Sequence, residues 1–342
     1  MKALFIGGTG NISAAVTEAC ATDWDLFLLT RGNKKDRLAA DIRATFLHGD
    51  INDEEAVAEL IKDMRFDAVV NFVNYSVAQV ERDIRLFSGK TRQYIFISTA
   101  SVYQKPLSGG TITESTLLSN PFWEYSRIKI ECEELLIREY RAKAFPVTIV
   151  RPSHTYDYTY LPTGIHGKNG SWPVLARMLA GKPLPLPGDG TTIWTMTHSS
   201  DFARGFKGLM GNPRAIGESF HITSDETLTW NQIYEAIGSA AGVKPNILHV
   251  PTDFLCACDP SYTGTLHGDK SNNAIFDNSK IKKLVPGFYA SVRFDIGIRK
   301  SVQYLLEHTE LHKEDPEFDR FCDALFDSMA NAAEYVKKQI NN

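Results

Sequence analysis

A glycine-rich turn between a short apolar run and a helical pattern constrains the fold of this chain more than any other feature. Residues Lys2–Ile6 read KALFI and predict a buried strand, and apolar positions at helical spacing predict a helix over Asn11–Cys20. Gly7-Gly-Thr-Gly10 joins the two. In such a turn Gly7 permits a tight bend, and Gly10 lets backbone N–H groups approach a pyrophosphate at the positive end of the helix dipole. The start of the chain therefore predicts a dinucleotide site.

The first 150 residues repeat this alternation of strand and helix. Further strands are predicted at the apolar runs Leu26–Leu29, Thr45–Leu47, Ala68–Phe72, Tyr94–Ile97 and Val147–Val150. Such a rhythm is typical of a parallel sheet with helical crossovers. We therefore expect an α/β fold, with a doubly wound parallel Rossmann sheet over residues 1–155. A smaller C-terminal substrate-binding lobe is expected over 156–342, with part of 190–225 returning to the Rossmann domain.

Beyond Arg151-Pro152 the pattern loosens into sequence rich in proline, glycine and tyrosine. The segment Pro183–Gly190 reads PLPLPGDG, which predicts a loop. Helical spacing of apolar residues predicts helices near Trp172–Ala180, Asp201–Met210, Thr229–Ala241 and Glu317–Lys338.

Composition points to an ordinary globular protein. The chain has 342 residues, of which 43% are hydrophobic, so it can bury a large core. No apolar run approaches the roughly 20 residues needed to cross a bilayer, and Met1-Lys2 leads into a strand rather than a signal peptide. Five scattered cysteines suit a reducing compartment, so we expect a cytoplasmic protein. A net charge of −4 argues against a nucleic-acid partner.

Several motifs at regular spacing carry a family resemblance. The glycine turn is followed by Asp50-Ile51, Ser98–Tyr103, Tyr125-x-x-x-Lys129, Arg151-Pro152, and Gly188-Asp-Gly190 with His198 and Asp201. In these residues, over about residues 1–240, the chain resembles the extended short-chain dehydrogenase/reductase family. Members of that family include sugar-nucleotide epimerases, dehydratases and reductases.

The catalytic residues implied by this resemblance are Thr99, Tyr125 and Lys129. Tyr125 and Lys129 are four residues apart, so on a helix they share one face, and an ammonium group beside a phenol favours the phenolate. Tyr125 is therefore expected to act as acid and base. By resemblance, Lys129 also binds the nicotinamide ribose, and the Thr99 hydroxyl orients the substrate oxygen.

The expected cofactor is NADP or NAD. The second strand ends in Leu28-Leu29-Thr30-Arg31, which has no carboxylate to bind the ribose 2′-hydroxyl of NAD. Arg31, with Lys34 and Lys35 nearby, suits a 2′-phosphate and therefore favours NADP. Ser13 replaces the third glycine of the turn and is small enough for close packing. The predicted cofactor-binding residues are Gly7, Thr9, Gly10, Asn11, Ile12, Arg31, Asp50, Ile51, Phe72, Val73, Tyr125, Lys129 and Pro152. No metal site is predicted.

Two departures from the family bear on the substrate. Ala100-Ser101 stands where 4,6-dehydratases carry an Asp-Glu pair, so a dehydratase lacks its acid and base here. Trp194 stands where sugar-nucleotide enzymes usually have an arginine that clamps the substrate diphosphate. An indole cannot replace a guanidinium, and the candidates to supply the missing charge are Lys168, Arg177 and Lys182.

The sequence thus predicts an NAD(P)-dependent oxidoreductase or epimerase. Its substrate would be a secondary alcohol or ketone of a sugar nucleotide or another carbohydrate-like molecule. The alternative is a non-catalytic dinucleotide- or RNA-binding protein on the same scaffold. By resemblance, the helices near Ser76–Ser88 and from Tyr125 to Arg141 would form the interface of a homodimer, and no membrane partner is expected.

Overall fold

The computed structural model describes residues 1–32 and 37–341. These residues divide into two compact units. The first unit contains Met1–Tyr156, Thr195–Glu226 and Ala274–Val292, and the second contains Asp157–Trp194, Thr227–Asn273 and Arg293–Asn342. The chain therefore passes between the units several times.

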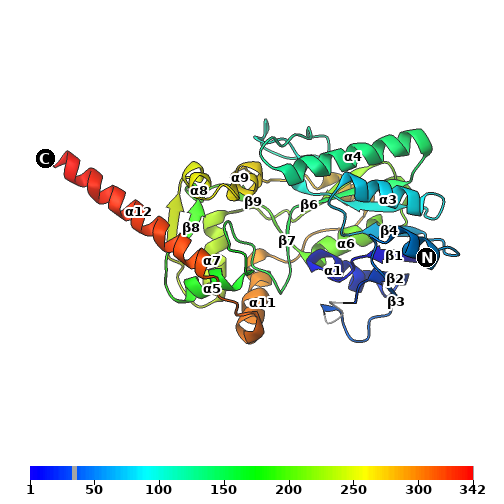
Figure 1. Cartoon of the computed structure of the whole chain (residues 1–342), viewed down its shortest axis with the longest axis horizontal. Helices are drawn as coiled ribbons and strands as arrows, with labels where there is room; N and C mark the ends of the chain where they lie inside the picture. Colours follow the sequence, from blue (N-terminus) through cyan, green and yellow to red (C-terminus); the bar gives the residue numbers. More distant parts are fainter. Residues whose placement is uncertain (33–36, 342) are drawn as a thin grey trace. The chain divides into compact units, whose positions relative to one another are not determined.

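A seven-stranded parallel sheet forms the centre of the first unit (Figure 1). Its order is β11-β6-β5-β4-β1-β2-β3, and every neighbouring pair is parallel. The strands are β1 (Lys2–Ile6), β2 (Asp25–Thr30), β3 (Thr45–His48), β4 (Ala68–Asn71), β5 (Tyr94–Ile97), β6 (Val147–Pro152) and β11 (Ser219–Ile222). This confirms the predicted doubly wound α/β fold.

Helices cover both faces of this sheet, because side chains alternate along each strand and both sets are apolar. Ala3 and Phe5 of β1 belong to one core, and Leu4 and Ile6 belong to the other. The first core includes residues of α1 (Asn11–Cys20), α6 (Ser199–Leu209) and α10 (Ser279–Leu284). The second includes residues of α2 (Glu54–Leu60), α3 (Val77–Phe87) and α4 (Glu124–Lys143).

The segment Ala274–Val292 belongs to the first unit, whereas the sequence analysis assigned it to the C-terminal lobe. Buried polar groups hold it there. Asp201 Oδ2 accepts a hydrogen bond from Val292 N–H (2.9 Å), and Asn278 Oδ1 accepts one from the Thr223 hydroxyl (3.0 Å). Because these contacts join residues far apart in sequence, no local sequence pattern predicts them. Nearby, β7 (His154–Tyr156) pairs with β10 (Met196–His198).

The second unit is mainly helical. Its helices are α5 (Trp172–Leu179), α7 (Trp230–Ala240), α8 (Thr252–Cys258), α9 (Tyr262–Thr265), α11 (Phe294–Glu307) and α12 (Pro316–Ile340), which confirms the helices predicted there. Two strand pairs complete it: β9 (Ile193–Trp194) with β12 (Leu228–Thr229), and β8 (Leu184–Pro187) with β13 (Ile247–Val250). In the part of the chain described, no helix is both long and apolar enough to span a bilayer.

Strand β8 corrects part of the loop predicted over Pro183–Gly190, because Leu184–Pro187 form a strand and only the residues from Gly188 onward form a turn. Leu184 N–H donates to Asn246 O and Gly188 N–H donates to Val250 O, both at 2.8 Å. The prolines at 185 and 187 alternate with these donors, so their missing N–H groups fall on the side of the strand that β13 does not use. Proline usually signals a loop, but at alternate positions of a strand paired on one side it removes no hydrogen bond of the ladder.

Candidate active site

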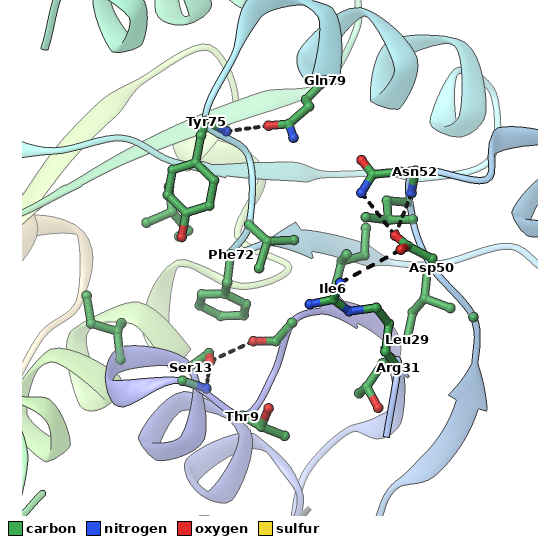
Figure 2. A pocket seen from close by; sticks show the side chains of 18 of the residues that line it. Ile6, Thr9, Ser13, Leu29, Arg31, Asp50, Asn52, Phe72, Tyr75 and Gln79 are labelled. Carbon is green, nitrogen blue, oxygen red and sulfur yellow. Dashed lines mark hydrogen bonds and ion pairs between the residues drawn. The ribbon is translucent and has the colours of Figure 1, made fainter. Parts of the chain in front are cut away.

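A cavity of about 650 Å³ lies at the C-terminal ends of β1, β2 and β4 in the first unit (Figure 2). The strand order reverses between β1 and β4, and at such a point a parallel sheet leaves a crevice for a ligand. The cavity is lined by the predicted cofactor residues Gly7, Thr9, Gly10, Asn11, Ile12, Arg31, Asp50, Ile51, Phe72 and Val73. Sequence positions spread over some 70 residues thus meet in one place.

The glycine turn forms the floor of the cavity beside α1. Gly7 has a φ of +78°, and a Cβ there would lie 2.5 Å from Val73 Cγ1, so this position requires glycine. Ser13 closes the turn, since its hydroxyl donates to Gly7 O (2.8 Å) and accepts from Gly10 N–H (2.7 Å). The first N–H groups of α1, beginning at Asn11, have no partner within the helix. This cradle fits the pyrophosphate of a dinucleotide.

Charged and polar side chains at the ends of β2 and β3 line another part of the cavity. Arg31 Nη1 lies 3.9 Å from Asp50 Oδ2. The Asp50 carboxylate also accepts hydrogen bonds from the backbone N–H and the side-chain amide of Asn52, each at 3.0 Å (Figure 2). Asn52 lines the cavity and was not predicted. Lys34 and Lys35, which the sequence analysis placed near Arg31, lie outside the described residues.

The loop that follows β4 supplies a third part of the lining. The Phe72 ring packs edge-on against Phe5, with ring centroids 5.6 Å apart. Tyr75 N–H donates to Gln79 Oε1 (2.6 Å), and both residues line the cavity (Figure 2). Tyr75 and Gln79 were missed by the sequence analysis, because no motif distinguishes them from other residues at the start of α3.

Lys129 of α4 is buried and joins this loop to β5. Its Nζ donates to Asn74 O (2.5 Å) and Ile97 O (2.8 Å), and it lies 5.2 Å from the centroid of the Tyr75 ring. Ile97 and Tyr75 both line the cavity, so Lys129 lies directly behind its wall. Burial lowers the pKa of Lys129 to about 8. The same Nζ is 5.8 Å from the ring centroid of Tyr125 on the next turn of the helix.

Thr99 begins a chain of three hydroxyl groups. Its Oγ1 accepts from Ser101 N–H (3.2 Å) and lies 3.0 Å from Ser101 Oγ, which in turn lies 2.7 Å from Ser126 Oγ. Ser101 and Ser126 are buried. The chain thereby links Thr99 to the residue next to Tyr125. In the sequence, Ser101 stands out only as the absence of a carboxylate, and no motif points to Ser126.

The Arg151-Pro152 motif lies on β6. The Arg151 guanidinium is buried and donates to both carboxylate oxygens of Glu133, with Nη2–Oε2 at 2.6 Å. This ion pair fixes α4, the helix that carries Tyr125, against the sheet. Pro152 ends β6 and, as far as the chain is described, is not among the residues that line the cavity.

In the second unit, Trp194 and the three cations considered as diphosphate clamps all contact other groups of the protein. Trp194 is buried and its Nε1 donates to Lys270 O (3.0 Å), so it is part of the core of that unit. The three candidate cations form ion pairs with carboxylates of α12: Lys168 with Glu317 (2.9 Å), Arg177 with Asp319 (2.5 Å) and Asp323 (2.6 Å), and Lys182 with Asp319 (2.9 Å).

Comparison with known proteins agrees with this geometry. The sequence profile of the NAD dependent epimerase/dehydratase family matches residues 3–88 and 84–223. The chain belongs to this family. The match confirms the expected enzyme class, the extended short-chain dehydrogenase type, and the expected class of cofactor, a nicotinamide dinucleotide.

Individual relatives differ in what their names report. A 2'-dehydrokanamycin reductase of Streptomyces kanamyceticus is 25% identical over 290 residues, covering 84% of this chain and 80% of its own. A chloroplast stem-loop binding protein of 41 kDa of Arabidopsis thaliana is 28% identical, covering 74% and 67%. The structure of a UDP-glucuronic acid 4-epimerase from Bacillus cereus, with UDP-glucuronic acid and NAD, has the same fold (TM-score 0.71, 20% identity, covering 90% and 99%).

We predict that Gly7→Ala strongly weakens cofactor binding without unfolding the protein. The added methyl would meet Val73 and would strain a backbone with positive φ, which displaces the turn that holds the pyrophosphate. Fluorescence titration with NADH should show an affinity at least about tenfold lower. Gly109→Ala is the matched control, because a Cβ at Gly109 has nothing within 4 Å. Unchanged binding by Gly7→Ala would contradict the assignment of the turn.

We predict that NADH binding weakens as the pH rises through about 8, the pKa of Lys129. The Lys129 ammonium has three N–H groups, of which the carbonyls of Asn74 and Ile97 take two. Deprotonation removes the third N–H, the one that by the family resemblance would bind the nicotinamide ribose. Titrations from pH 6.5 to 9.5 should show this alkaline decline in the wild type. Lys129→Met should bind more weakly and without the decline; the same decline in the variant would refute the role of Lys129.

Proposed function

We propose that this protein is an NAD(P)-dependent oxidoreductase or epimerase that acts on a secondary alcohol or ketone of a carbohydrate-like substrate. The observation that carries the proposal is the position of Lys129. Its amine is anchored on the carbonyls of Asn74 and Ile97 at the wall of the dinucleotide cavity, and it shares a helix face with Tyr125. Lys129 thus connects the wall of the proposed cofactor site to the turn of α4 that carries Tyr125.

In this proposal Tyr125 exchanges a proton with the substrate oxygen. The positive charge of Lys129 behind it favours the phenolate form. A bound nicotinamide supplies or accepts the hydride. A reductase would release its oxidised cofactor after each turnover, and an epimerase would retain it; the residues described here serve both.

The order of donors along the hydroxyl chain decides whether the Thr99 hydroxyl is free to donate a hydrogen bond to the substrate. A hydroxyl group has one hydrogen to donate and two lone pairs that accept. Thr99 already accepts from Ser101 N–H. If Ser126 donates to Ser101 and Ser101 donates to Thr99, both lone pairs of Thr99 are used, and its hydrogen is directed to a further partner. That partner would be a carbonyl or alkoxide oxygen, so Thr99 suits the stabilisation of a ketone.

The ion pairs of the second unit bear on the proposed substrate class. The 4-epimerase structure contains UDP-glucuronic acid, which carries a diphosphate, whereas the reductase relative is named for 2'-dehydrokanamycin. In this chain Lys168, Arg177 and Lys182 are each paired with carboxylates of α12. The pairs of Lys168 and Lys182 are exposed and weak, but the ion pair of the buried Arg177, with Trp194 at the clamp position, favours a carbohydrate without a diphosphate over a sugar nucleotide. A dehydratase is disfavoured, because Ala100 and the buried Ser101 offer no acid or base.

The stem-loop binding relative raises the alternative of an RNA-binding protein. A net charge of −4 does not favour a polyanionic partner. The catalytic pair Tyr125 and Lys129, which RNA binding would not require, favours the enzyme.

We further propose that α3 and α4, which are neighbours on one face of the sheet, form the interface of a homodimer.

Turnover assays test the proposed function. Purified protein would be incubated with NADPH or NADH and either 2'-dehydrokanamycin or a 4-keto sugar nucleotide, while the absorbance at 340 nm is followed. Epimerisation of UDP-glucuronic acid would be followed by chromatography. We expect Tyr125→Phe to lower kcat by about 10²–10⁴-fold, because it removes the acid and base. Tyr289→Phe, at an exposed tyrosine of the first unit, is the control. Full activity of Tyr125→Phe would refute the mechanism.

We propose NADP as the preferred cofactor, because Arg31 follows β2 directly and lines the cavity. Arg31→Ala should weaken NADPH binding about tenfold or more and NADH binding by less than about threefold, since the guanidinium would contact only the 2′-phosphate. Calorimetric titration of both cofactors measures the ratio. An equal loss for the two cofactors would contradict the preference for NADP.

A further inference from the structure

A buried ion pair of α3 lies beside the cavity, and the mechanism above makes no use of it. Arg82 and Asp83 are 6% and 0% exposed. Arg82 donates from Nε (3.0 Å) and Nη2 (2.8 Å) to Asp83 Oδ1. Burying two charges is costly, so their remaining hydrogen bonds are informative.

The Nη1 group of Arg82 contacts a residue that lines the cavity near the end of β3. This group donates to Asn52 Oδ1 (2.8 Å), and Asn52 in turn donates twice to the Asp50 carboxylate, as Figure 2 shows. Asp50 and Asn52 both line the cavity. Arg82 therefore fixes the orientation of the polar groups at this end.

The Nη2 group of Arg82 contacts the loop that anchors Lys129. Arg82 Nη2 also donates to Asn74 Oδ1 (3.1 Å), and the carbonyl of Asn74 accepts from Lys129 Nζ (2.5 Å). Asp83 Oδ2 holds the same loop, because it accepts from the amides of Asn71 (2.6 Å) and Asn74 (2.8 Å). The Tyr94 hydroxyl donates to this oxygen as well (2.6 Å).

We infer that Arg82 is a positioning residue for the cofactor, in that one guanidinium fixes both the Asp50–Asn52 end of the dinucleotide site and the Asn74 carbonyl that anchors Lys129. The planar fork of an arginine can aim two N–H groups at fixed points in this way, whereas the single point charge of a lysine cannot. The inference rests on the proposed function, because it takes the cavity to hold NAD(P). A purely structural Arg82 would serve only to neutralise Asp83.

The test compares Arg82→Lys with Arg85→Lys. Both substitutions lie on α3, and Arg85 also donates from Nε (2.9 Å) and Nη2 (2.7 Å) to a carboxylate, that of Glu54, but on the surface. Dissociation constants would be measured for NADH, for AMP and for nicotinamide mononucleotide, at a temperature where circular dichroism shows each variant folded. We expect Arg82→Lys to weaken NADH binding at least tenfold and both half-molecules severalfold. Arg85→Lys should stay within twofold of the wild type.

Asn52→Ala distinguishes a positioning role of Arg82 in the cofactor site from a general loss of protein structure. It should weaken AMP binding and leave nicotinamide mononucleotide binding unchanged. The double variant Asn52→Ala/Arg82→Lys should bind AMP no more weakly than Asn52→Ala alone, because Arg82 acts on that end through Asn52. Independent, additive losses would overturn the inference.

A second variant keeps the test decisive if Arg82→Lys does not fold. Replacing the pair by neutral side chains, as Arg82→Met/Asp83→Asn, leaves no unpaired charge and keeps a side-chain oxygen at position 83 that can accept from Asn71, Asn74 and Tyr94. This folded variant should still lose at least tenfold in NADH affinity. Wild-type affinity in either folded variant would overturn the inference. A wild-type protein that binds neither NADH nor NADPH would instead overturn the proposed function.

Discussion

The anchoring of the Lys129 amine on two backbone carbonyls is the interaction on which the rest of the site depends. Asn74 O belongs to the loop after β4, Ile97 O to the end of β5, and Lys129 to α4. One buried cation thus joins three elements that come from distant parts of the sequence. Burial lowers its pKa to about 8, so the group that holds the site together also titrates near neutral pH.

Polar groups arranged around this anchor make the site rigid. The Arg151–Glu133 ion pair fixes α4 from the side of β6, and the Thr99–Ser101–Ser126 chain connects the end of β5 to the residue next to Tyr125. Buried networks of this kind hold their members in one geometry when every group is satisfied. The proposed catalytic pair, Tyr125 and Lys129, is therefore carried by a helix rather than by a loop.

The parts of the fold and site that local sequence determines could be predicted. The run KALFI, the glycine turn and the following helix were predicted with the observed bounds, because strand alternation, positive φ and helical spacing are local signals. The family resemblance and the predicted strand ends added Arg31, Asp50, Ile51, Phe72 and Val73, all of which line the cavity. The contacts of Asn74 with Arg82, and the tie of Asp201 to Val292, depend on residues far apart in sequence and left no local trace. Strand β8 was not predicted because the alternating prolines of this segment are typical of a loop.

The most direct test of the account asks whether the cavity holds a dinucleotide. Protein purified under native conditions would be desalted, denatured, and analysed by mass spectrometry for released NAD or NADP, and the desalted protein would then be titrated with NADPH and NADH. The account predicts one dinucleotide site per chain, seen either as a co-purified cofactor or as saturable binding. Release of neither cofactor together with no binding of NADPH or NADH would contradict it.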